Sequence, residues 1–339
     1  MSSLTTRIGR SARFLATVAT FAVIAGYATL VLSDRSAHLT PGSISLGRNA
    51  PLGGRQLLPP DNAWNTRVDS LPVDPQSAQF IHAMGEDLPL HADFGPSRSG
   101  LRLYGIPYVV VDSREMTGYR VRFENVEESD TIEYPIPPRP PMEAGGDRHL
   151  LVLDRTTWRL YELFHAARTA AGWQAGSGAV FDLASNQMRP LGWTSADAAG
   201  LPILPGLARA DEVYDGKEVT HALRFTMPRT QRAARFPARH FASQSRDSTL
   251  PPMGLRVRLR ATIDPLTFPE GARVIVRALQ QYGMLLADNG GPWFVSGTAD
   301  RRWRRADLSA LNRLRGSDFE VVESPEGTAG NATRTGPVP

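Results

Sequence analysis

The segment from His149 to Ala166, HLLVLDRTTWRLYELFHA, places two histidines and a glutamate within two short apolar strand patterns. If residues 154–157 form the turn of a hairpin, counting outward along both strands sets His149 opposite Glu162. Side chains alternate along a strand, so this pair would end an otherwise apolar face. A carboxylate beside an imidazole favours the protonated ring, and the pair is either an acid–base site or a structural ion pair that seals the sheet.

A second candidate is His221, which opens the strand pattern THALRFTM on the same face as Leu223 and Phe225. This apolar face is where a groove would hold a ligand, although a core histidine with satisfied hydrogen bonds has the same pattern. Arg224 lies on the opposite face because successive side chains alternate. His221 and Arg224 therefore cannot line one flat surface.

Two loops add further polar side chains. Asp288 and Asn289 follow the apolar run MLLA, and the next two glycines allow a turn that would expose both beside Trp293. The sequence Asp-Asn-Gly-Gly is also ordinary turn chemistry. Arg239 and His240 lie in the loop ARFPARHFAS, where a guanidinium suits a carboxylate, phosphate or sulfate, or is simply solvated. The candidate substrate-binding residues are Arg224, Arg239, His240, Asn289 and Trp293.

Several classes of site are excluded because their motifs are missing. The chain has no cysteine, which excludes disulfides, thiolate metal sites and a cysteine nucleophile. No His-Glu-x-x-His, His-x-His or EF-hand pattern is present, so we predict no metal, although distant loops could still assemble a site. Glycine-rich phosphate loops are absent too, and we predict no cofactor.

The formal net charge of +4 comes mostly from arginine, because Lys217 is the single lysine. Acidic residues are interspersed, and no basic block alternates with aromatic residues as a nucleic-acid surface would require. We therefore predict that the protein does not bind nucleic acid, while a polyanionic ligand stays open.

The pattern of short alternating segments separated by glycine and proline indicates a mainly β fold. We predict an antiparallel β-sandwich or jelly roll with a few appended short helices, and an α+β layout is the alternative. One amphipathic helix is predicted from about residue 269 to 282. Its apolar face comprises Ala272, Ile275, Val276, Leu279 and Tyr282.

The N-terminal region predicts export. Arg7, Arg10 and Arg13 precede an uncharged run, residues 14–33, that is long enough to span a bilayer as a helix. Positive charge on its N-terminal side predicts that the rest of the chain is exported and anchored to the inner membrane. An uncleaved anchor is favoured over a cleaved signal peptide because the run exceeds the usual signal-peptide core. The predicted divisions are an anchor or signal peptide at 1–33, a flexible tether at 34–58, one β-rich domain at 59–323 and a disordered tail at 324–339.

The motifs PDNAWN, SGAVFDL, GWTSADAAGLP, HALRFT and ADNGG occur in this order between about Pro59 and Val322. In wording and order they resemble those of a group of uncharacterised exported bacterial proteins. The resemblance implies a single export-associated domain. It implies no activity, and no catalytic residue is carried over from it.

Export, a β-rich domain and histidines with carboxylates at strand ends indicate a carbohydrate-active enzyme of the cell envelope, either a polysaccharide hydrolase or a lyase. In a hydrolase, Glu162 or Asp288 would protonate the leaving oxygen while the other served as base or nucleophile. In a lyase, His149 or His221 would remove the proton beside a uronate carboxylate, which an arginine would neutralise.

Tryptophans are expected to provide the sugar-binding surface, because an indole ring can stack on a sugar ring. The alternative function is a non-catalytic glycan-binding or envelope-scaffold domain, which would use the same aromatic and polar loop residues. In both cases the predicted partner is a polysaccharide or other envelope glycan. The tryptophans expected to contact it are Trp158, Trp173, Trp193 and Trp293.

Overall fold

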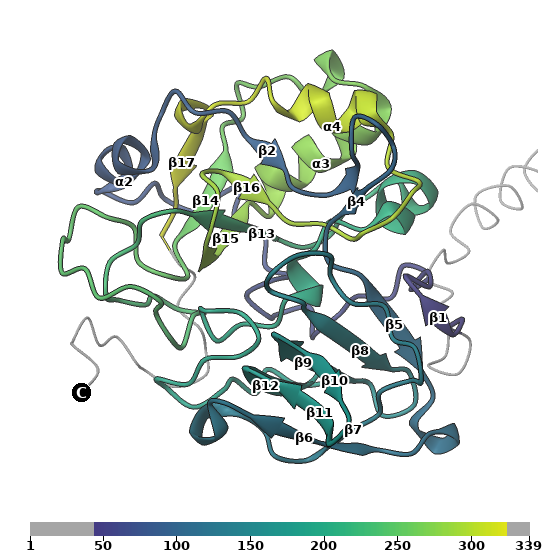
Figure 1. The fold of residues 1–339 in the computed structure, drawn as a ribbon. Helices are drawn as coiled ribbons and strands as arrows, with labels where there is room; N and C mark the ends of the chain where they lie inside the picture. Colours follow the sequence, from purple (N-terminus) through teal and green to yellow (C-terminus); the bar gives the residue numbers. More distant parts are fainter. Residues whose placement is uncertain (1–43, 324–339) are drawn as a thin grey trace, which may run out of the picture. The chain divides into compact units, whose positions relative to one another are not determined.

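Short strands dominate the computed structural model, which describes residues 44–323 (Figure 1). Within these residues, seventeen strands form four sheets, accompanied by three α-helices and several short 3₁₀ or π turns. The predicted mainly β fold with a few short helices is confirmed. The α-helices are α2 (Ser77–Met84), α3 (Glu270–Gln281) and α4 (Arg305–Leu311), and the short turns are η2 (Ser113–Glu115), η3 (Val126–Glu128), η4 (Leu204–Gly206), η5 (Asp211–Gly216), η6 (Pro265–Thr267) and η7 (Gly316–Asp318).

Two sheets of the first half of the described chain pack face to face. Tyr134 of the second sheet lies against Tyr161 of the first, with ring centroids 5.6 Å apart, inside a shared apolar cluster. The first sheet has the order β1 (Gly47–Arg48), β5 (Tyr108–Val111), β8 (Leu150–Asp154), β9 (Arg159–Phe164) and β12 (Ser177–Asp182). The second has the order β10 (Ala167–Thr169), β11 (Gly172–Ala175), β6 (Tyr119–Phe123) and β7 (Glu133–Tyr134).

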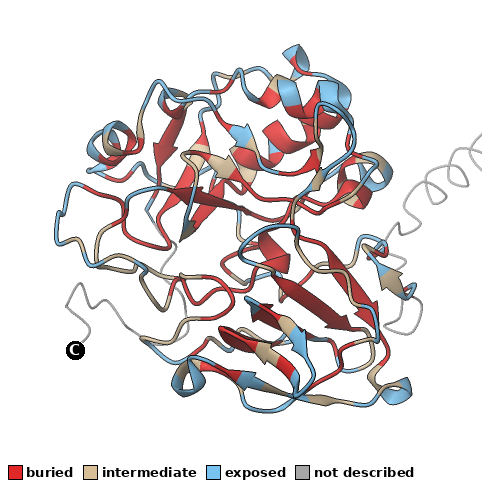
Figure 2. Cartoon of the chain, viewed as in Figure 1, coloured by how far each residue is buried: buried red, intermediate tan, exposed pale blue. Residues whose placement is uncertain are grey.

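The first sheet is apolar on both faces, which explains the unbroken run LLVL in β8. Leu151 and Leu153 face the main core, whereas Leu150 and Val152 face the smaller core shared with the second sheet. Side chains alternate along a strand, so a strand that separates two cores must be apolar at every position. The strands of this sheet are accordingly buried along most of their length (Figure 2).

The second half of the described chain forms a six-stranded sheet with α3 packed on it. Helix α3 connects β14 to β15, and the apolar face predicted for residues 269–282 is buried throughout, which confirms that prediction. Each of the three larger sheets contains at least one parallel pair, so the sheets are mixed. The sheet order is β17 (Phe319–Val321), β14 (Arg256–Leu259), β15 (Met284–Asn289), β13 (Leu223–Met227), β16 (Phe294–Val295) and β2 (His91–Ala92), and a separate hairpin joins β3 (Gly95–Pro96) to β4 (Leu103–Tyr104).

The folded domain begins earlier than the sequence predicts. Ile44, Leu52 and Leu57 are buried in the main core, and β1 pairs with β5, so residues 44–58 belong to the domain and are not a tether. The tether was predicted because this segment lacks periodicity, but a segment without periodicity can still bury isolated apolar side chains in the core. The predicted anchor, the remainder of the tether and the predicted tail lie outside the described residues. No helix between residues 44 and 323 is long and apolar enough to cross a membrane.

The β8–β9 hairpin has a different register from the predicted one. Leu151 lies opposite Glu162, and the loop comprises residues 155–158. The carboxylate of Asp154 accepts hydrogen bonds from Ser113 and Thr157, which keeps Asp154 in the strand and delays the turn by one residue. The predicted pairing of His149 with Glu162 is therefore wrong, although both side chains still point to the same face of the sheet.

A buried arginine fastens the PDNAWN segment to the second half of the domain. Arg256 of β14 donates hydrogen bonds to the backbone carbonyls of Ala63, Thr66 and Tyr282, the last two at 2.9 and 2.6 Å. Burial lowers the pKa of Arg256 to about 9. The guanidinium thus joins the segment of Ala63 and Thr66 and the end of α3 at Tyr282 to its own strand, β14.

We predict that Arg256→Lys lowers the free energy of unfolding by about 2–4 kcal/mol, because one ammonium cannot serve three carbonyl groups in this geometry. Arg277→Lys is the matched control, since Arg277 is exposed on α3. Chemical denaturation of the two variants and the wild type measures the effect. Equal stability of the two variants would contradict the role assigned to Arg256.

Candidate functional site

Polar side chains from both halves of the domain meet around Arg224 of β13. Its Nε and Nη2 donate to the two carboxylate oxygens of Asp197 at 2.7 and 2.8 Å, and its Nη1 donates to Ser296 at 2.7 Å. Nη2 also donates to Asp288 at 3.1 Å. Burial acts to lower the pKa of Arg224, but the charge and hydrogen bonds of Asp197 together with the charges of Asp288 and Glu143 outweigh burial and raise the pKa above its ordinary value.

The loop before η4 holds Asp197 in place. The Ser195 hydroxyl accepts a hydrogen bond from the Asp197 backbone N–H and donates to the Leu201 carbonyl, which closes a tight turn. The backbone N–H of Ala199 donates to the carbonyl of Ala287 in β15. The fully buried carboxylate of Asp197 is thereby fixed against Arg224.

A bulge directs Asp288 toward the same guanidinium. In the β13–β15 pairing, Phe225 lies opposite Leu286 and Thr226 lies opposite Asp288, so Ala287 is skipped. A bulge of this kind changes the direction of the side chains that follow it. The Asp288 side chain stays 26% exposed, and burial together with the negative charge of Asp197 raises its pKa to about 6 despite the nearby Arg224.

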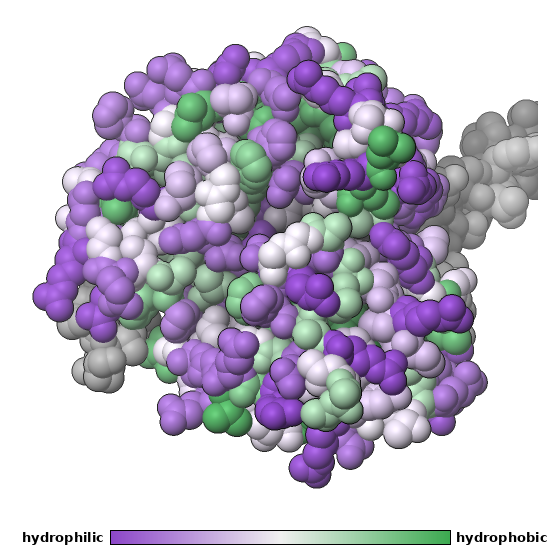
Figure 3. Space-filling view, in the orientation of Figure 1, coloured by the Kyte–Doolittle hydropathy of each residue, from purple (hydrophilic) through white to green (hydrophobic). Residues whose placement is uncertain are grey.

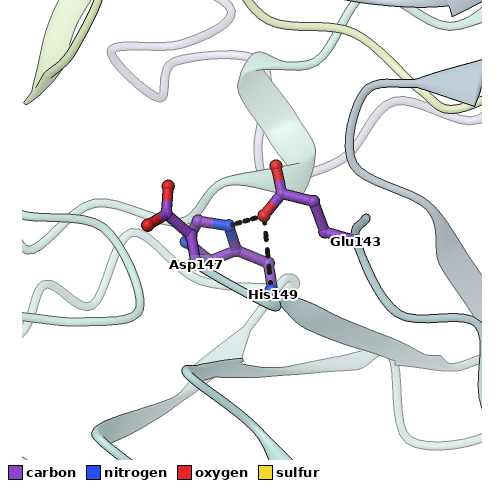
Figure 4. A group of neighbouring side chains, drawn as sticks. All are labelled: Glu143, Asp147 and His149. Carbon is purple, nitrogen blue, oxygen red and sulfur yellow. Dashed lines mark hydrogen bonds and ion pairs between the residues drawn. The ribbon is translucent and has the colours of Figure 1, made fainter. Parts of the chain in front are cut away.

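His149 holds a second carboxylate, that of Glu143 (Figure 4). Its Nδ1 lies 2.5 Å from Oε2 of Glu143, and its Nε2 lies 3.1 Å from the carbonyl oxygen of Ala196. Both ring nitrogens thus face acceptors, which suits the imidazolium ion. Burial acts to lower the pKa of His149, but Glu143 outweighs burial and the pKa is raised.

Glu143 stays ionised in this arrangement. Burial acts to raise its pKa, but the hydrogen bond and charge of His149 outweigh burial and the pKa falls below its ordinary value of 4.5. Its side chain is 19% exposed, so part of it is in contact with solvent. Asp147 also approaches the pair, and one ligand atom from each of the three side chains lies within 4.8 Å of the others.

These groups form one electrostatic cluster. The positive charge of Arg224 acts on the pKa values of Glu143 and Asp288, and His149 also acts on Asp288. Asp93 belongs to the cluster too, because the charges of Glu143 and Arg224 act on its pKa, the first raising it and the second lowering it. Burial is the largest cause, and the pKa of Asp93 is raised. The surface over the region between the two larger sheets carries both hydrophilic and hydrophobic side chains (Figure 3). The cluster therefore combines partly exposed carboxylates with two buried cations.

Glu162 is not part of the accessible cluster. Its side chain is fully buried and accepts hydrogen bonds from the backbone N–H groups of Ile203 and Leu204 at 2.9–3.0 Å. Burial raises its pKa to about 7, although the two N–H donors act in the opposite direction. Glu162 thus anchors the start of η4 to the first sheet, which corrects its predicted catalytic role.

His221 also has a structural environment. Its Nε2 lies 3.2 Å from Glu212 and its Nδ1 lies 2.8 Å from the carbonyl oxygen of Ala222. The ring is buried and both nitrogens have partners. The core alternative stated for this histidine therefore fits the structure better than a catalytic role.

Most of the predicted sugar-binding tryptophans are inaccessible. Trp293 is completely buried, its ring is stacked between Phe225 and Phe319, and its Nε1 donates to the carbonyls of Met84 and Gly85. A substrate-binding role for Trp293 is wrong for this reason. Trp158 and Trp173 are buried as well, and of the four predicted tryptophans Trp193 alone is partly exposed.

Arg239 lines a largely apolar pocket beside the Asp197 loop. Its Nε donates to the carbonyl of Arg189 at 2.9 Å, and none of the carboxylates between residues 44 and 323 forms an ion pair with it. Burial lowers its pKa. Other residues that line the pocket are Leu58, Asn62, Trp64, Phe181, Leu201 and Pro202.

His240 and Asn289 lie beside the cluster, His240 next to the Asp197 loop and Asn289 directly after Asp288 in β15. His240 lies 2.8 Å from the carbonyl oxygen of Ala198 through Nδ1 and stacks on Phe241. Asn289 is exposed, and its side chain accepts a hydrogen bond from Thr230 at 2.8 Å. Neither side chain contacts Arg224 directly.

Glu143, Asp93 and the pairing of Asp197 with Arg224 were not predicted from the sequence. Glu143 lies in a proline-rich loop and Asp93 in a short polar segment, where no periodicity assigns a direction to a side chain. An arginine in an apolar strand pattern was the one available signal, because a buried guanidinium needs hydrogen-bond acceptors, and a carboxylate is one kind of acceptor.

Comparisons with protein families, with curated proteins and with solved structures found no match to the chain.

We predict that Glu162→Ala lowers the free energy of unfolding by about 2–5 kcal/mol, since two buried N–H groups lose their acceptor. The folded pKa of about 7 exceeds the ordinary 4.5, so folded Glu162 keeps its proton where the unfolded chain has released it. The stabilisation by this proton is complete below pH 4.5 and is lost as the pH rises to about 7. Denaturation at pH 5 and pH 8 should show a larger difference between wild type and variant at pH 5.

The exposed Glu127→Ala is the control for this experiment. A pH-independent difference for Glu162→Ala would show that the raised pKa is incorrect.

Proposed function

We propose that the domain is a hydrolase that cleaves glycosidic bonds in an exported or cell-envelope polysaccharide. The observation that carries this proposal is the pair of partly exposed carboxylates, Asp288 and Glu143, whose pKa values are displaced in opposite directions around Arg224. Two carboxyl groups whose environments separate their pKa values are suited to acid and base roles in one reaction.

In this proposal Asp288 is the general acid. With a pKa of about 6 it carries its proton in mildly acidic solution and donates that proton to the leaving glycosidic oxygen. Glu143 remains a carboxylate and acts as nucleophile at the anomeric carbon or as base toward a water molecule. His149 orients Glu143, and Arg224 orients Asp288.

The lyase alternative has less support. It requires a histidine that can accept a proton from the substrate, but both ring nitrogens of His149 and of His221 already face hydrogen-bond acceptors. Both rings are also buried, which separates them from a polymer. Arg239, which forms no ion pair within the described residues, supports a preference for a glycan with acidic groups.

Non-catalytic glycan binding is the second candidate, since Trp193, Asn289 and Arg239 could contact a glycan without reaction. The predicted anchor supports a location at the cell envelope for either function.

We predict that the full chain releases new reducing ends from at least one member of a panel of neutral, uronic-acid and envelope polysaccharides. Asp288→Asn and Glu143→Gln should each reduce kcat by about 10²–10⁴-fold, because each removes a group that transfers a proton or attacks the substrate. The exposed Asp87→Asn and Glu127→Gln are the matched controls and should retain activity. Binding of a polymer without release of reducing ends would favour the second candidate.

We predict a bell-shaped dependence of kcat/KM on pH. Activity should fall above about pH 6 as Asp288 loses its proton, and below the ordinary glutamate pKa of 4.5 as Glu143 gains one. Rates measured between pH 3 and pH 9 test this dependence. A rate that keeps rising to pH 8 would contradict the assignment of Asp288 as the acid.

A further inference from the structure

An exposed surface with leucines and unpaired arginines lies around β1 and the β3–β4 hairpin. Leu46, Leu101 and Leu103 line the same open depression as Arg48 and Arg301. Leu101 is 85% exposed and Leu46 is 47% exposed, which are high values for large apolar side chains. In Figure 3 hydrophobic side chains surrounded by hydrophilic ones are visible where Figure 1 places β4. We call the surface formed by Leu46, Arg48, Arg98, Leu101, Arg102, Leu103 and Arg301 the leucine–arginine face.

The exposure of Leu101 is imposed by a well-bonded turn. The Ser97 N–H donates to the Arg102 carbonyl at 2.8 Å, and the Arg102 N–H donates to the Ser97 hydroxyl at 3.1 Å. From α4, Arg305 donates to the carbonyls of Ser97 and Arg98. The turn is therefore attached to the body of the domain and presents Leu101 outward at a defined position.

The face carries an excess of positive charge. Arg48, Arg98, Arg102 and Arg301 are exposed, and none of them forms an ion pair with a carboxylate in the described part of the chain. The neighbouring Arg302 differs, because Asp215 and Asp300 already neutralise it. Four uncompensated guanidinium groups thus surround the exposed leucines.

Apolar side chains surrounded by cations match the chemistry of an anionic lipid surface, in which acyl chains lie beneath negative headgroups. Each arginine near such a surface is attracted by the negative headgroups, and insertion of the leucines among the acyl chains adds to this attraction. The short segment between the predicted membrane span and the domain also favours contact of this face with a lipid bilayer. The predicted membrane span ends at residue 33, and the ten residues 34–43 can reach at most about 36 Å before Ile44, which is two residues from Leu46.

We propose that the leucine–arginine face docks on an anionic phospholipid bilayer. The inference is independent of the proposed hydrolase reaction, because none of its residues belongs to the cluster around Arg224. Docking of this kind would hold the domain in one orientation on the membrane.

The cysteine-free chain allows a direct test with a single fluorescent label. The full chain carrying Leu101→Cys, labelled with an environment-sensitive nitrobenzoxadiazole probe, is reconstituted into vesicles of equal parts phosphatidylglycerol and phosphatidylethanolamine. The control label is at Val126→Cys, since Val126 is 54% exposed at η3 and outside the leucine–arginine face. We expect a blue shift and an intensity rise of at least about twofold for the label at 101 alone, with quenching by brominated lipid.

Charge variants and neutral vesicles separate lipid docking from other causes. The triple variant Arg98→Gln, Arg102→Gln and Arg301→Gln should lose the shift, whereas the exposed triple control Arg229→Gln, Arg246→Gln and Arg277→Gln should keep it. Phosphatidylcholine vesicles should give a smaller shift than the anionic ones. Identical solvent-like emission from both labels would overturn the proposal. A blue shift without lipid quenching would do so too, because the label would then be covered by protein, such as a second copy of the chain.

Discussion

The buried ion pair between Arg224 and Asp197 is the interaction on which the candidate site depends. Removing two charges from water is costly, and such a pair is tolerated only when its hydrogen bonds are satisfied. Here the guanidinium makes two bonds to Asp197 and further bonds to Ser296 and Asp288. The pair thereby joins the loop before η4 to β13, β15 and the segment after β16. Loss of one partner from a pair of this kind costs about 3–5 kcal/mol.

The same pair sets the electrostatics of its neighbours. Burial raises the pKa of Asp288 to about 6, and the negative charge of Asp197, the ion-pair partner of Arg224, acts in the same direction. Glu143 has its own cation in His149, and its pKa moves in the opposite direction. Burial acts to raise the pKa of both carboxyl groups, but Asp288 also faces the negative charge of Asp197, whereas Glu143 has the imidazolium of His149 as its own cation.

The two histidines that precede β8 and β13 each bind a glutamate carboxylate. His149 is paired with Glu143 and His221 with Glu212, and in each ring the second nitrogen lies against a backbone carbonyl. An imidazole paired in this way holds the glutamate carboxylate in place. Because both of its nitrogens already have partners, it has little capacity to take a proton from a substrate. Within the cluster around Arg224, the acidic side chains of Asp288 and Glu143 are consequently more exposed than His149.

The sequence by itself determined the mainly β class, the strands within residues 149–166 and 220–227, and the buried face of α3, because alternation and helical periodicity depend on neighbouring residues. It could not determine the register of β8 and β9, since the side chain of Asp154 holds the strand one residue longer through bonds to Ser113 and Thr157. The burial of Trp293 and the pairing of Arg224 with Asp197 were decided by tertiary structure alone. Those contacts join residues far apart in the chain, and local patterns carry no information about which distant group will lie opposite a side chain.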